Sequence, residues 1–471
     1  MPLHHTSRHS HHSRPALPSL PSRRAFLKTI GAAALAAPFV TRDLLADPPS
    51  ARLRHAAVGL AHMGWQDLQQ LSSFDGVEIA ALCDVDESLA AKARETFPNA
   101  RFFRDWREML AKMGGSLDSI NVSTPDHMHA PIAVSAMNLG LHAYVQKPLA
   151  HELCEVRRMR EIARAKKLVT QMGIQIHSNA HYRIAVAALR AGAIGRVREA
   201  HSWCHKTWGD PSPKPGRVDP VPENLAWDNW LGVRDARPYI GDISDNPAKA
   251  NHYYHPSNWR KRLDFGTGTL GDMACHIFDP VFGGLGLGSP VSVRSDGPAP
   301  AHGNWGLDAR VTLAFAPTPF TAAGAFRLFW YDGDQRPPAE ITGLVELDKL
   351  KDGRLPNQGT LFVGENGALL LPHIARAQLF PTATHAGYQL PREKGANHWK
   401  TFVEACRGND RTTAGFDYAG PLTEAVLLGG VAARFPKTTL KWDSAALKFD
   451  LKAADKHIRR DYRKGWEVAG L

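Results

Sequence analysis

The stretch Leu53-Arg54-His55-Ala56-Ala57-Val58-Gly59-Leu60-Ala61-His62-Met63-Gly64 decides the fold of this 471-residue chain. It places a short, mostly apolar strand directly before a turn bounded by two glycines. A helical stretch through Leu71 follows, and Val77–Cys83 is a second apolar strand that ends at Asp84. A strand, a tight turn, a helix and another strand predict a βαβ unit with parallel strands.

The turn Gly59-x-Ala61-x-x-Gly64 differs from the pattern G-x-G-x-x-G only at its middle position. Small residues there let the backbone approach a pyrophosphate, and the N-terminus of the following helix attracts the anion. Asp84 can accept hydrogen bonds from ribose hydroxyls and would repel a 2′-phosphate, which favours NAD over NADP. The alternatives are a turn without a ligand and a helix N-cap at Asp84. The cofactor contacts predicted here are Gly59, Ala61, His62, Met63, Gly64 and Asp84.

Strands and helices continue to alternate up to about residue 175. Buried strands are expected at Ser119–Val122 and His142–Val145, and helices over 130–139 and 152–166. The later chain shows alternating, strand-like stretches separated by loops rich in Pro, Gly and Trp. We therefore predict an α/β protein with a doubly wound, parallel Rossmann domain at 53–175. An α+β domain with a large open, mainly antiparallel sheet is expected at 176–471.

Residues 1–52 are predicted to be a leader and linker. Ser22-Arg23-Arg24-Ala25-Phe26-Leu27-Lys28 precedes an Ala-rich apolar run at 30–40, the pattern of a twin-arginine export signal. Chains with such a signal fold before export, so we expect a periplasmic protein that engages the twin-arginine machinery with its cofactor already bound. The sequence leaves open whether the leader is cleaved, after Ala34-Leu35-Ala36 or Leu44-Leu45-Ala46, or retained.

Composition argues against several other classes of protein. The net charge is +11, but no basic stripe with interleaved aromatic residues is present, so nucleic acid is not an expected partner. No run after the leader approaches the roughly 18 apolar residues of a membrane span. The five cysteines never form a C-x-x-C pair, and no histidine pair is completed by a carboxylate or thiol. We expect neither a disulfide framework nor a metal site.

Two further motifs follow predicted buried strands. Ser123-Thr124-Pro125-Asp126-His127-Met128-His129 comes after one strand, and Gln146-Lys147-Pro148 after the next. Together with the turn they resemble the Gfo/Idh/MocA family, named for glucose–fructose oxidoreductase and inositol dehydrogenase, whose motifs are T-P-x-x-x-H and E-K-P. Gln146 stands where that family more often has Glu. The resemblance implies cofactor contacts from Ser123, Thr124, Pro125, His129, Gln146 and Lys147, and a homo-oligomer formed through the C-terminal sheet.

The resemblance also implies catalytic roles for Lys147, Asp272 and His276. Asp272 and His276 are spaced i,i+4, so a helix would place them on one face. Lys147 would stabilise an oxyanion, and His276 would take the hydroxyl proton. Asp272 would orient the imidazole or hold a neighbouring hydroxyl. Without the lysine motif, a helix-terminal aspartate and a core histidine would be the simpler interpretation.

Aromatic residues crowd the loops before the Asp272 segment, and aromatic faces suit sugar rings. Trp259, Arg260 and His255 are the candidates for substrate contact. We therefore predict an NAD-dependent oxidoreductase acting on a sugar, cyclitol or glycoside.

An exported enzyme has no obvious NAD pool, which favours a closed redox cycle. One form is sugar–sugar transhydrogenation, and the other is glycoside hydrolysis by oxidation, elimination, hydration and reduction. A sugar-binding protein with a retired site is the alternative from another class. The sequence does not identify the sugar.

Overall fold

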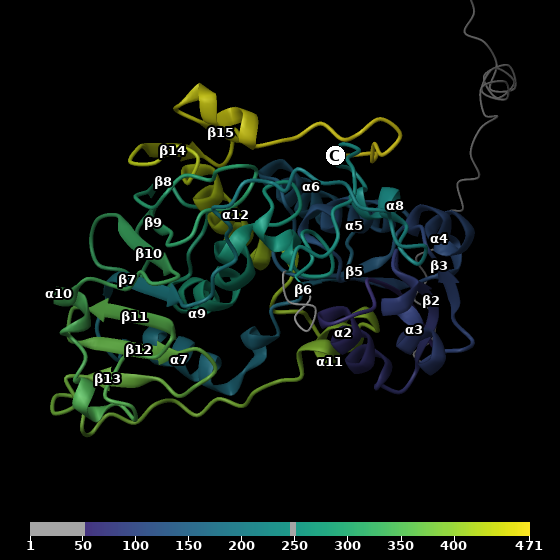
Figure 1. Ribbon diagram of the computed structural model, residues 1–471. Coiled ribbons are helices and arrows are strands. Elements are labelled where there is room, and N and C mark those ends of the chain that lie inside the picture. The colour runs from purple at the N-terminus through teal and green to yellow at the C-terminus, as the bar shows by residue number, and fades with distance from the viewer. Residues whose placement is uncertain (1–51, 245–250) are drawn as a thin grey trace, which may run out of the picture. The chain divides into compact units, whose positions relative to one another are not determined.

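The predicted βαβ unit lies in a six-stranded sheet of the computed structural model, which describes residues 52–244 and 251–471 (Figure 1). The sheet order is β3-β2-β1-β4-β5-β6, and every pairing is parallel. The order reverses between β1 and β4, where ligands bind outside the carboxyl ends of the strands. The strands are β1 (Leu53–Val58), β2 (Val77–Cys83), β3 (Arg101–Phe103), β4 (Ser119–Val122), β5 (His142–Val145) and β6 (Thr170–Met172).

Each helix of this unit begins close to the end of a strand. Asp86 caps the helix after β2 by accepting hydrogen bonds from the backbone N–H groups of Ser88 and Leu89. The N-cap role considered for Asp84 therefore belongs to Asp86. The helices are α2 (Met63–Ser72), α3 (Glu87–Thr96), α4 (Trp106–Met113), α5 (His129–Asn138) and α6 (Leu153–Ala165).

The remaining chain builds a nine-stranded sheet of order β13-β12-β11-β7-β10-β9-β8-β14-β15. Only the β7–β10 pairing is parallel, so the sheet is mixed and mostly antiparallel. The predicted fold class is confirmed. The strands are β7 (Val197–Cys204), β8 (Ser292–Ser295), β9 (Arg310–Phe315), β10 (Phe326–Asp332), β11 (Gln358–Gly364), β12 (Ala368–Pro372), β13 (Gln378–Phe380), β14 (Thr439–Asp443) and β15 (Lys448–Phe449).

Helices cover the inner face of this sheet. The α9 helix packs against β7 and β11, and α12 packs against β8 and β9. A π-helical turn, Leu270–Ala274, leads directly into α9. No helix in the described part of the chain is long and apolar enough to cross a membrane. The helices are α7 (Ala180–Arg190), α8 (Trp227–Leu231), α9 (Cys275–Leu285), α10 (Ala339–Thr342), α11 (His398–Cys406) and α12 (Phe416–Ala432).

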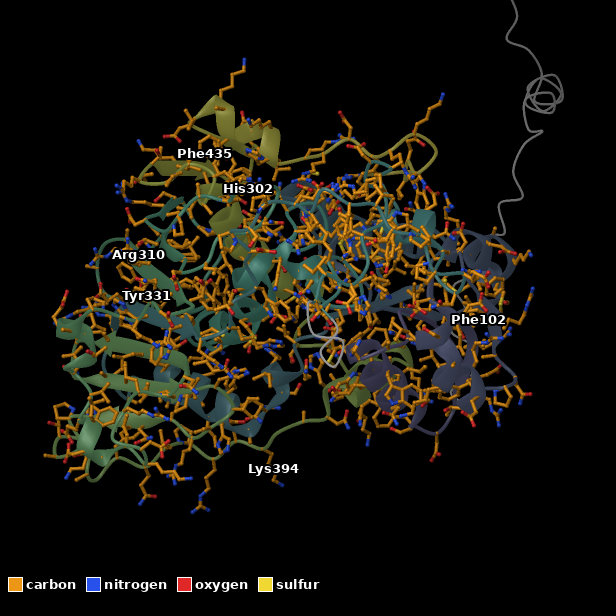
Figure 2. All side chains as sticks on the ribbon, in the orientation of Figure 1. Phe102, His302, Arg310, Tyr331, Lys394 and Phe435 are labelled. Atoms are coloured by element: carbon orange, nitrogen blue, oxygen red, sulfur yellow. The ribbon has the colours of Figure 1, made fainter. Side chains whose placement is uncertain are left out.

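The outer face of the nine-stranded sheet is partly covered by its own chain. Trp203 and Tyr331 on this face pack with Val345 and Leu350 from the segment after α10. On the neighbouring strand β9, Arg310, the register partner of Tyr331, is exposed (Figure 2). The predicted oligomer contact through this sheet stays a prediction.

Candidate active site

One cavity of about 430 Å³ lies at the switch point of the parallel sheet. Segments that follow strands of both sheets line it, because the loops after β1, β2, β4, β5 and β7 and the π-helical turn all reach it. Every residue predicted for the cofactor, the chemistry or the substrate lies on its wall. These residues are Gly59, Ala61, His62, Met63, Gly64, Asp84, Ser123, Thr124, Pro125, His129, Gln146, Lys147, His255, Trp259, Arg260, Asp272 and His276.

The turn after β1 has the conformation that its glycines predict. Gly59 has φ of 84°, and a Cβ there would collide with the carbonyl group of Ser123 on the neighbouring strand end. A Cβ on Gly64 would collide with the carbonyl of Gly59. The turn therefore lies directly against the adjoining loop and leaves the N-terminus of α2 open toward the cavity. This geometry fits a bound pyrophosphate.

Asp84 lies at the end of β2, as the ribose-binding pattern requires. Its Oδ2 accepts the backbone N–H of Leu60 at 2.8 Å, and Oδ1 accepts that of Asp86 at 3.0 Å. Burial raises the pKa of this carboxyl, and those N–H bonds oppose the shift. Asp84 thus links the glycine turn to the strand end and faces the cavity, so the residues present fit a nicotinamide dinucleotide.

Ser123 and Gln146, which were predicted to contact the cofactor, instead bind the buried carboxylate of Asp67. Ser123 Oγ and Gln146 Nε2 each donate to Asp67 Oδ2 at 2.8 Å, and Trp399 Nε1 donates to Oδ1 at 2.9 Å. Burial raises the pKa of Asp67 to about 6 against these bonds. Gln146 supplies the N–H donor that a glutamate at this position would lack unless it were protonated. These two side chains fix the floor of the site.

The His129 ring contacts backbone carbonyl groups in two loops of the site. Its Nε2 lies 2.8 Å from the carbonyl oxygen of Thr124, and its Nδ1 lies 2.7 Å from that of Pro148. Both ring nitrogens are therefore directed at backbone groups. The imidazole joins the loop after β4 to the loop after β5, and so holds Pro148, the residue that follows Lys147, in place.

The centre of the site is a carboxylate surrounded by cations. Lys147 Nζ donates to Asp272 Oδ1 at 2.8 Å and to its backbone carbonyl at 2.7 Å. Lys206 Nζ and Trp208 Nε1 donate to Oδ2 at 3.1 and 2.9 Å, and Arg260 Nε lies 3.5 Å from Oδ1. Burial alone would raise the pKa of Asp272, but the three cations outweigh it and hold the pKa far below its usual range. Asp272 is therefore ionised.

His276 lies in the same wall as a buried, neutral imidazole. Burial, followed by the charge of Lys147, lowers its pKa well below the usual histidine range. Its Nδ1 is buried and has no hydrogen-bond partner among the described residues. A neutral ring can accept a proton, and the role of His276 as the base stays a prediction.

One of the two roles predicted for Asp272, orienting the His276 imidazole, has no supporting hydrogen bond among the described residues. The spacing predicted one face of an α-helix, but Asp272 lies in the π-helical turn and His276 in α9. A π-helix has i→i+5 bonding, so the turn differs from the regular α-helix that the spacing assumed, although both side chains still line the cavity. Both carboxylate oxygens are occupied by Lys147, Lys206 and Trp208. Asp272 positions the lysine rather than the histidine.

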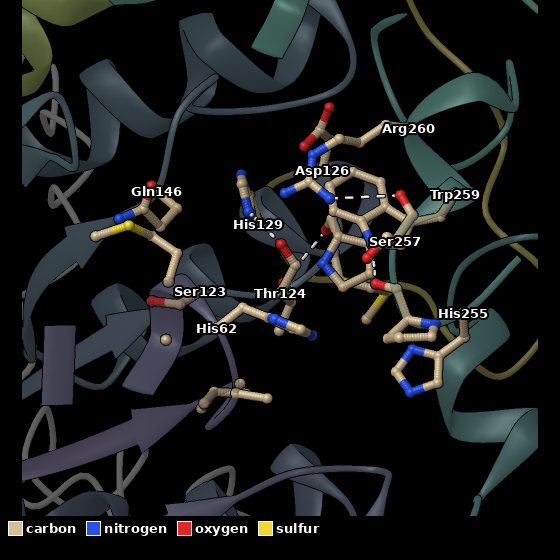
Figure 3. A pocket seen from close by; sticks show the side chains of 18 of the residues that line it. His62, Ser123, Thr124, Asp126, His129, Gln146, His255, Ser257, Trp259 and Arg260 are labelled. Atoms are coloured by element: carbon tan, nitrogen blue, oxygen red, sulfur yellow. Dashed lines mark hydrogen bonds between the residues drawn. The ribbon is translucent and has the colours of Figure 1, made fainter. Parts of the chain in front are cut away.

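The three substrate candidates separate into two places. Trp259 and Arg260 lie on a short 3-10 helix, and the Arg260 guanidinium lies 4.2 Å from the centre of the Trp259 ring (Figure 3). Arg260 is also close to Asp272. His255 accepts from Trp230 Nε1 at 3.1 Å and lies 3.0 Å from Asp86 Oδ2. His255 thus lies at the predicted ribose end, away from the Asp272 cluster.

Sequence reasoning missed Lys206, and it did not connect Trp208 with Asp272. Both residues follow β7 directly. Lys147 was predicted because it follows the carboxyl end of a strand, and the same criterion could have found Lys206. No group of three His, Cys, Asp or Glu side chains in the described residues could hold a metal ion.

The chain has a Rossmann sheet with a glycine turn, an aspartate at a strand end and a lysine in the cavity. These features are typical of oxidoreductases that bind a dinucleotide. Two family profiles match the chain: an oxidoreductase family with NAD-binding Rossmann fold at residues 53–174, and its C-terminal alpha/beta domain at residues 200–318. The chain belongs to the Gfo/Idh/MocA oxidoreductase family, and NAD is the dinucleotide that its first domain is built to bind.

Curated relatives match over part of their length. The chain is 25% identical over 199 residues to levoglucosan dehydrogenase of Pseudarthrobacter phenanthrenivorans, covering 42% of this chain and 40% of that protein. It is 25% identical over 154 residues to a glycosyl hydrolase family 109 protein of Shewanella sp., covering 31% of this chain and 33% of the relative. The chain thus matches less than half the length of either relative.

The fold is also seen in solved structures. The aldose-aldose oxidoreductase from Caulobacter crescentus, complexed with glycerol, superposes with a TM-score of 0.55. The match covers 83% of this chain and 100% of that one at 16% identity. At this identity the likeness establishes the shared architecture alone.

Proposed function

We propose that this chain oxidises a hydroxyl group of a sugar, cyclitol or glycoside with NAD as the hydride acceptor. The observation that carries the proposal is the joint placement of Lys147, ionised Asp272 and neutral His276 on the wall of the cavity that Asp84 and the Gly59 turn also line. The dehydrogenase among its relatives supports a sugar as substrate. The residues serve the reaction in three distinct ways.

Lys147 supplies the positive charge for the reacting oxygen. Its two bonds to Asp272 fix Nζ at the cavity wall, and a fixed cation stabilises the negative charge that develops when a hydroxyl loses its proton. His276 receives that proton, because its ring is neutral in the folded protein. NAD, when bound, supplies the hydride acceptor. The products are then a carbonyl compound, reduced cofactor and one proton.

A redox-neutral cycle is the second candidate. It is favoured by the similarity to a glycosyl hydrolase family 109 protein and by the export pattern at Ser22–Lys28, because an exported enzyme lacks a cytoplasmic supply of NAD. In the hydrolase form, the stored hydride returns to the oxidised sugar after the aglycone has been eliminated. In the transhydrogenase form, a second sugar replaces the first and receives the hydride. We further propose periplasmic localisation through the twin-arginine machinery, and a homo-oligomer through the nine-stranded sheet.

The test uses purified, NAD-loaded protein without free cofactor and a panel of sugars and glycosides. Continued aglycone release indicates the hydrolase cycle, and paired formation of lactone and alditol indicates transhydrogenation. One turnover that then stops indicates a dehydrogenase that needs external NAD. A protein that binds no NAD at micromolar concentration and converts no sugar contradicts the proposal, and would favour a sugar-binding protein.

A further inference from the structure

We propose that the sugar acted on carries an anionic group, a carboxylate or a phosphate, and that Lys206 and Arg260 bind this group. The inference rests on the proposed function, because it names the substrate class of the same cavity. Neither residue is needed for the hydride and proton transfer assigned to Lys147 and His276. Both lie on segments outside the parallel sheet and line the cavity near Asp272.

The first observation is an excess of positive charge. Lys147, Lys206 and Arg260 all lie within 3.5 Å of the single carboxylate of Asp272. The other carboxylate on this part of the wall, Asp126, accepts the Thr267 hydroxyl at 2.6 Å. Among the described residues around Asp272, cations therefore outnumber carboxylates by three to two, and the third carboxylate on the cavity wall, Asp84, lies at the predicted ribose end.

The neighbouring histidines do not change this balance. Burial lowers the pKa of His276 well below its usual range and that of His373 to about 4, so both rings are neutral at pH 7. Holding an unmatched positive charge in a partly buried wall costs free energy unless an anion balances it. A monoanionic sugar supplies that anion, whereas a neutral sugar leaves the excess in place.

The second observation is the way Arg260 is held. Its guanidinium lies 4.2 Å from the centre of the Trp259 ring and 5.3 Å from that of Trp208. Its bond to the carbonyl of Ser257 is long, at 3.4 Å, and its approach to Asp272 is 3.5 Å (Figure 3). Two indoles thus fix a planar fork that makes no short hydrogen bond with any carboxylate of the described residues. Such a fork is suited to bidentate binding of a carboxylate or phosphate.

The third observation is the accessibility of Lys206. Its side chain is 41% exposed, whereas that of Lys147 is 13% exposed, although both contact the same carboxylate. Within residues 52–244 and 251–471, Lys206 Nζ makes one hydrogen bond, to Asp272 Oδ2, so two of its three donors can bind a ligand. Lys206 and Arg260 approach different oxygens of Asp272, and therefore flank one site.

The experiment compares matched sugars on NAD-loaded protein. A hexuronate is paired with its neutral hexuronamide, and a hexose 6-phosphate with the parent hexose, so that the two arms separate carboxylate from phosphate. The quantity measured is the ratio of kcat/KM for the anionic and neutral members of each pair. We expect a preference of about 10- to 100-fold for the anion in at least one arm, the size of a charge-assisted hydrogen-bond contribution.

Variants assign the preference to the two residues. Arg260→Gln and Lys206→Gln should each lower the anion preference about tenfold or more while changing kcat/KM for the neutral sugar less. Lys214→Gln is the matched control, because Lys214 is an exposed lysine of the same loop region and its loss removes the same charge. The Kd for NAD, measured by tryptophan fluorescence, should stay within about threefold in all three variants.

The outcomes separate the inference from the proposed function. Oxidation of neutral sugars with a ratio near one in both arms overturns the anionic substrate and leaves the proposed function standing. A large loss of NAD affinity in the Arg260 and Lys206 variants, with an unchanged ratio of kcat/KM for anionic and neutral sugars, would mean that these side chains bind the cofactor. That result also overturns the inference. Absence of NAD binding and of any sugar oxidation overturns both.

Discussion

Replacing Lys147 by methionine tests the chemical core of the site. Methionine keeps much of the length of the side chain but removes its charge. Asp272 would keep three partners, because Lys206 and Trp208 still donate to it and Arg260 remains 3.5 Å away. The carboxylate is therefore not left unpaired, and we expect the variant to fold.

The magnitude follows from the charge that is lost. A unit positive charge about 4 Å from a developing oxyanion is worth ~4 kcal/mol at an effective dielectric constant near 20. This corresponds to a loss of about 10³-fold in kcat. The glycine turn and Asp84 lie elsewhere on the cavity wall, so the Kd for NAD should change by less than about tenfold.

The assay measures single-turnover reduction of bound NAD together with the Kd for NAD and the thermal midpoint. Lys400→Met, on the exposed side of α11, is the control for loss of a lysine charge. A Lys147→Met protein that reduces NAD within tenfold of the wild-type rate would refute the assigned role of Lys147. Loss of activity accompanied by unfolding would be resolved with Lys147→Arg, which keeps the charge and should retain more activity than the methionine variant.

Three other perturbations address the cofactor, the base and the turn. Asp84→Asn should weaken NAD binding about tenfold and narrow the discrimination against NADP, since the carboxylate that repels a 2′-phosphate is removed; fluorescence titration with both cofactors measures this. His276→Asn should lower kcat by about 10²- to 10⁴-fold. Because burial lowers the His276 pKa, the wild-type pH profile of kcat/KM should stay level through pH of about 6.5 and decline only below it. Gly59→Ala should destabilise the protein by about 2 kcal/mol, because the added Cβ meets the Ser123 carbonyl at a positive φ; denaturant unfolding measures it against Gly115→Ala, where a Cβ has open space.

These predictions have clear contrary results. An unchanged ratio of NAD to NADP affinity in Asp84→Asn would remove that residue from the ribose contact. An acid limb at the ordinary histidine pKa would show that His276 is not the buried base. Equal stability of the Gly59 and Gly115 variants would mean that the turn does not adopt the described conformation.

The parallel sheet and the glycine turn could be predicted because their determinants are local. A buried strand, two glycines and an acidic strand end occupy about thirty consecutive residues and report on one βαβ unit. The same locality explains why Lys147 was found at a strand end. Short strands such as β6 and β13 carry too few residues for an alternating pattern to be recognised.

The contacts between distant segments could not be predicted. Asp67 accepts a hydrogen bond from Trp399, which lies 332 residues away in the sequence. Lys206 donates to Asp272, which lies 66 residues away. No periodicity specifies such pairs. His255 was placed with the substrate because its loop is rich in aromatic residues, yet the fold directs it to Asp86. The π-helical turn likewise depends on packing rather than on the spacing of Asp272 and His276.

Isotope transfer tests the central claim most directly. NAD-loaded protein is mixed with a substrate sugar whose carbon-bound hydrogens are all deuterium, in ordinary water, and the nicotinamide is analysed by mass spectrometry after one turnover. The account predicts one deuterium on the reduced nicotinamide ring, and strongly reduced transfer in Lys147→Met and His276→Asn. Bound nicotinamide that gains only hydrogen from water, or that stays oxidised while no sugar is converted, would contradict it.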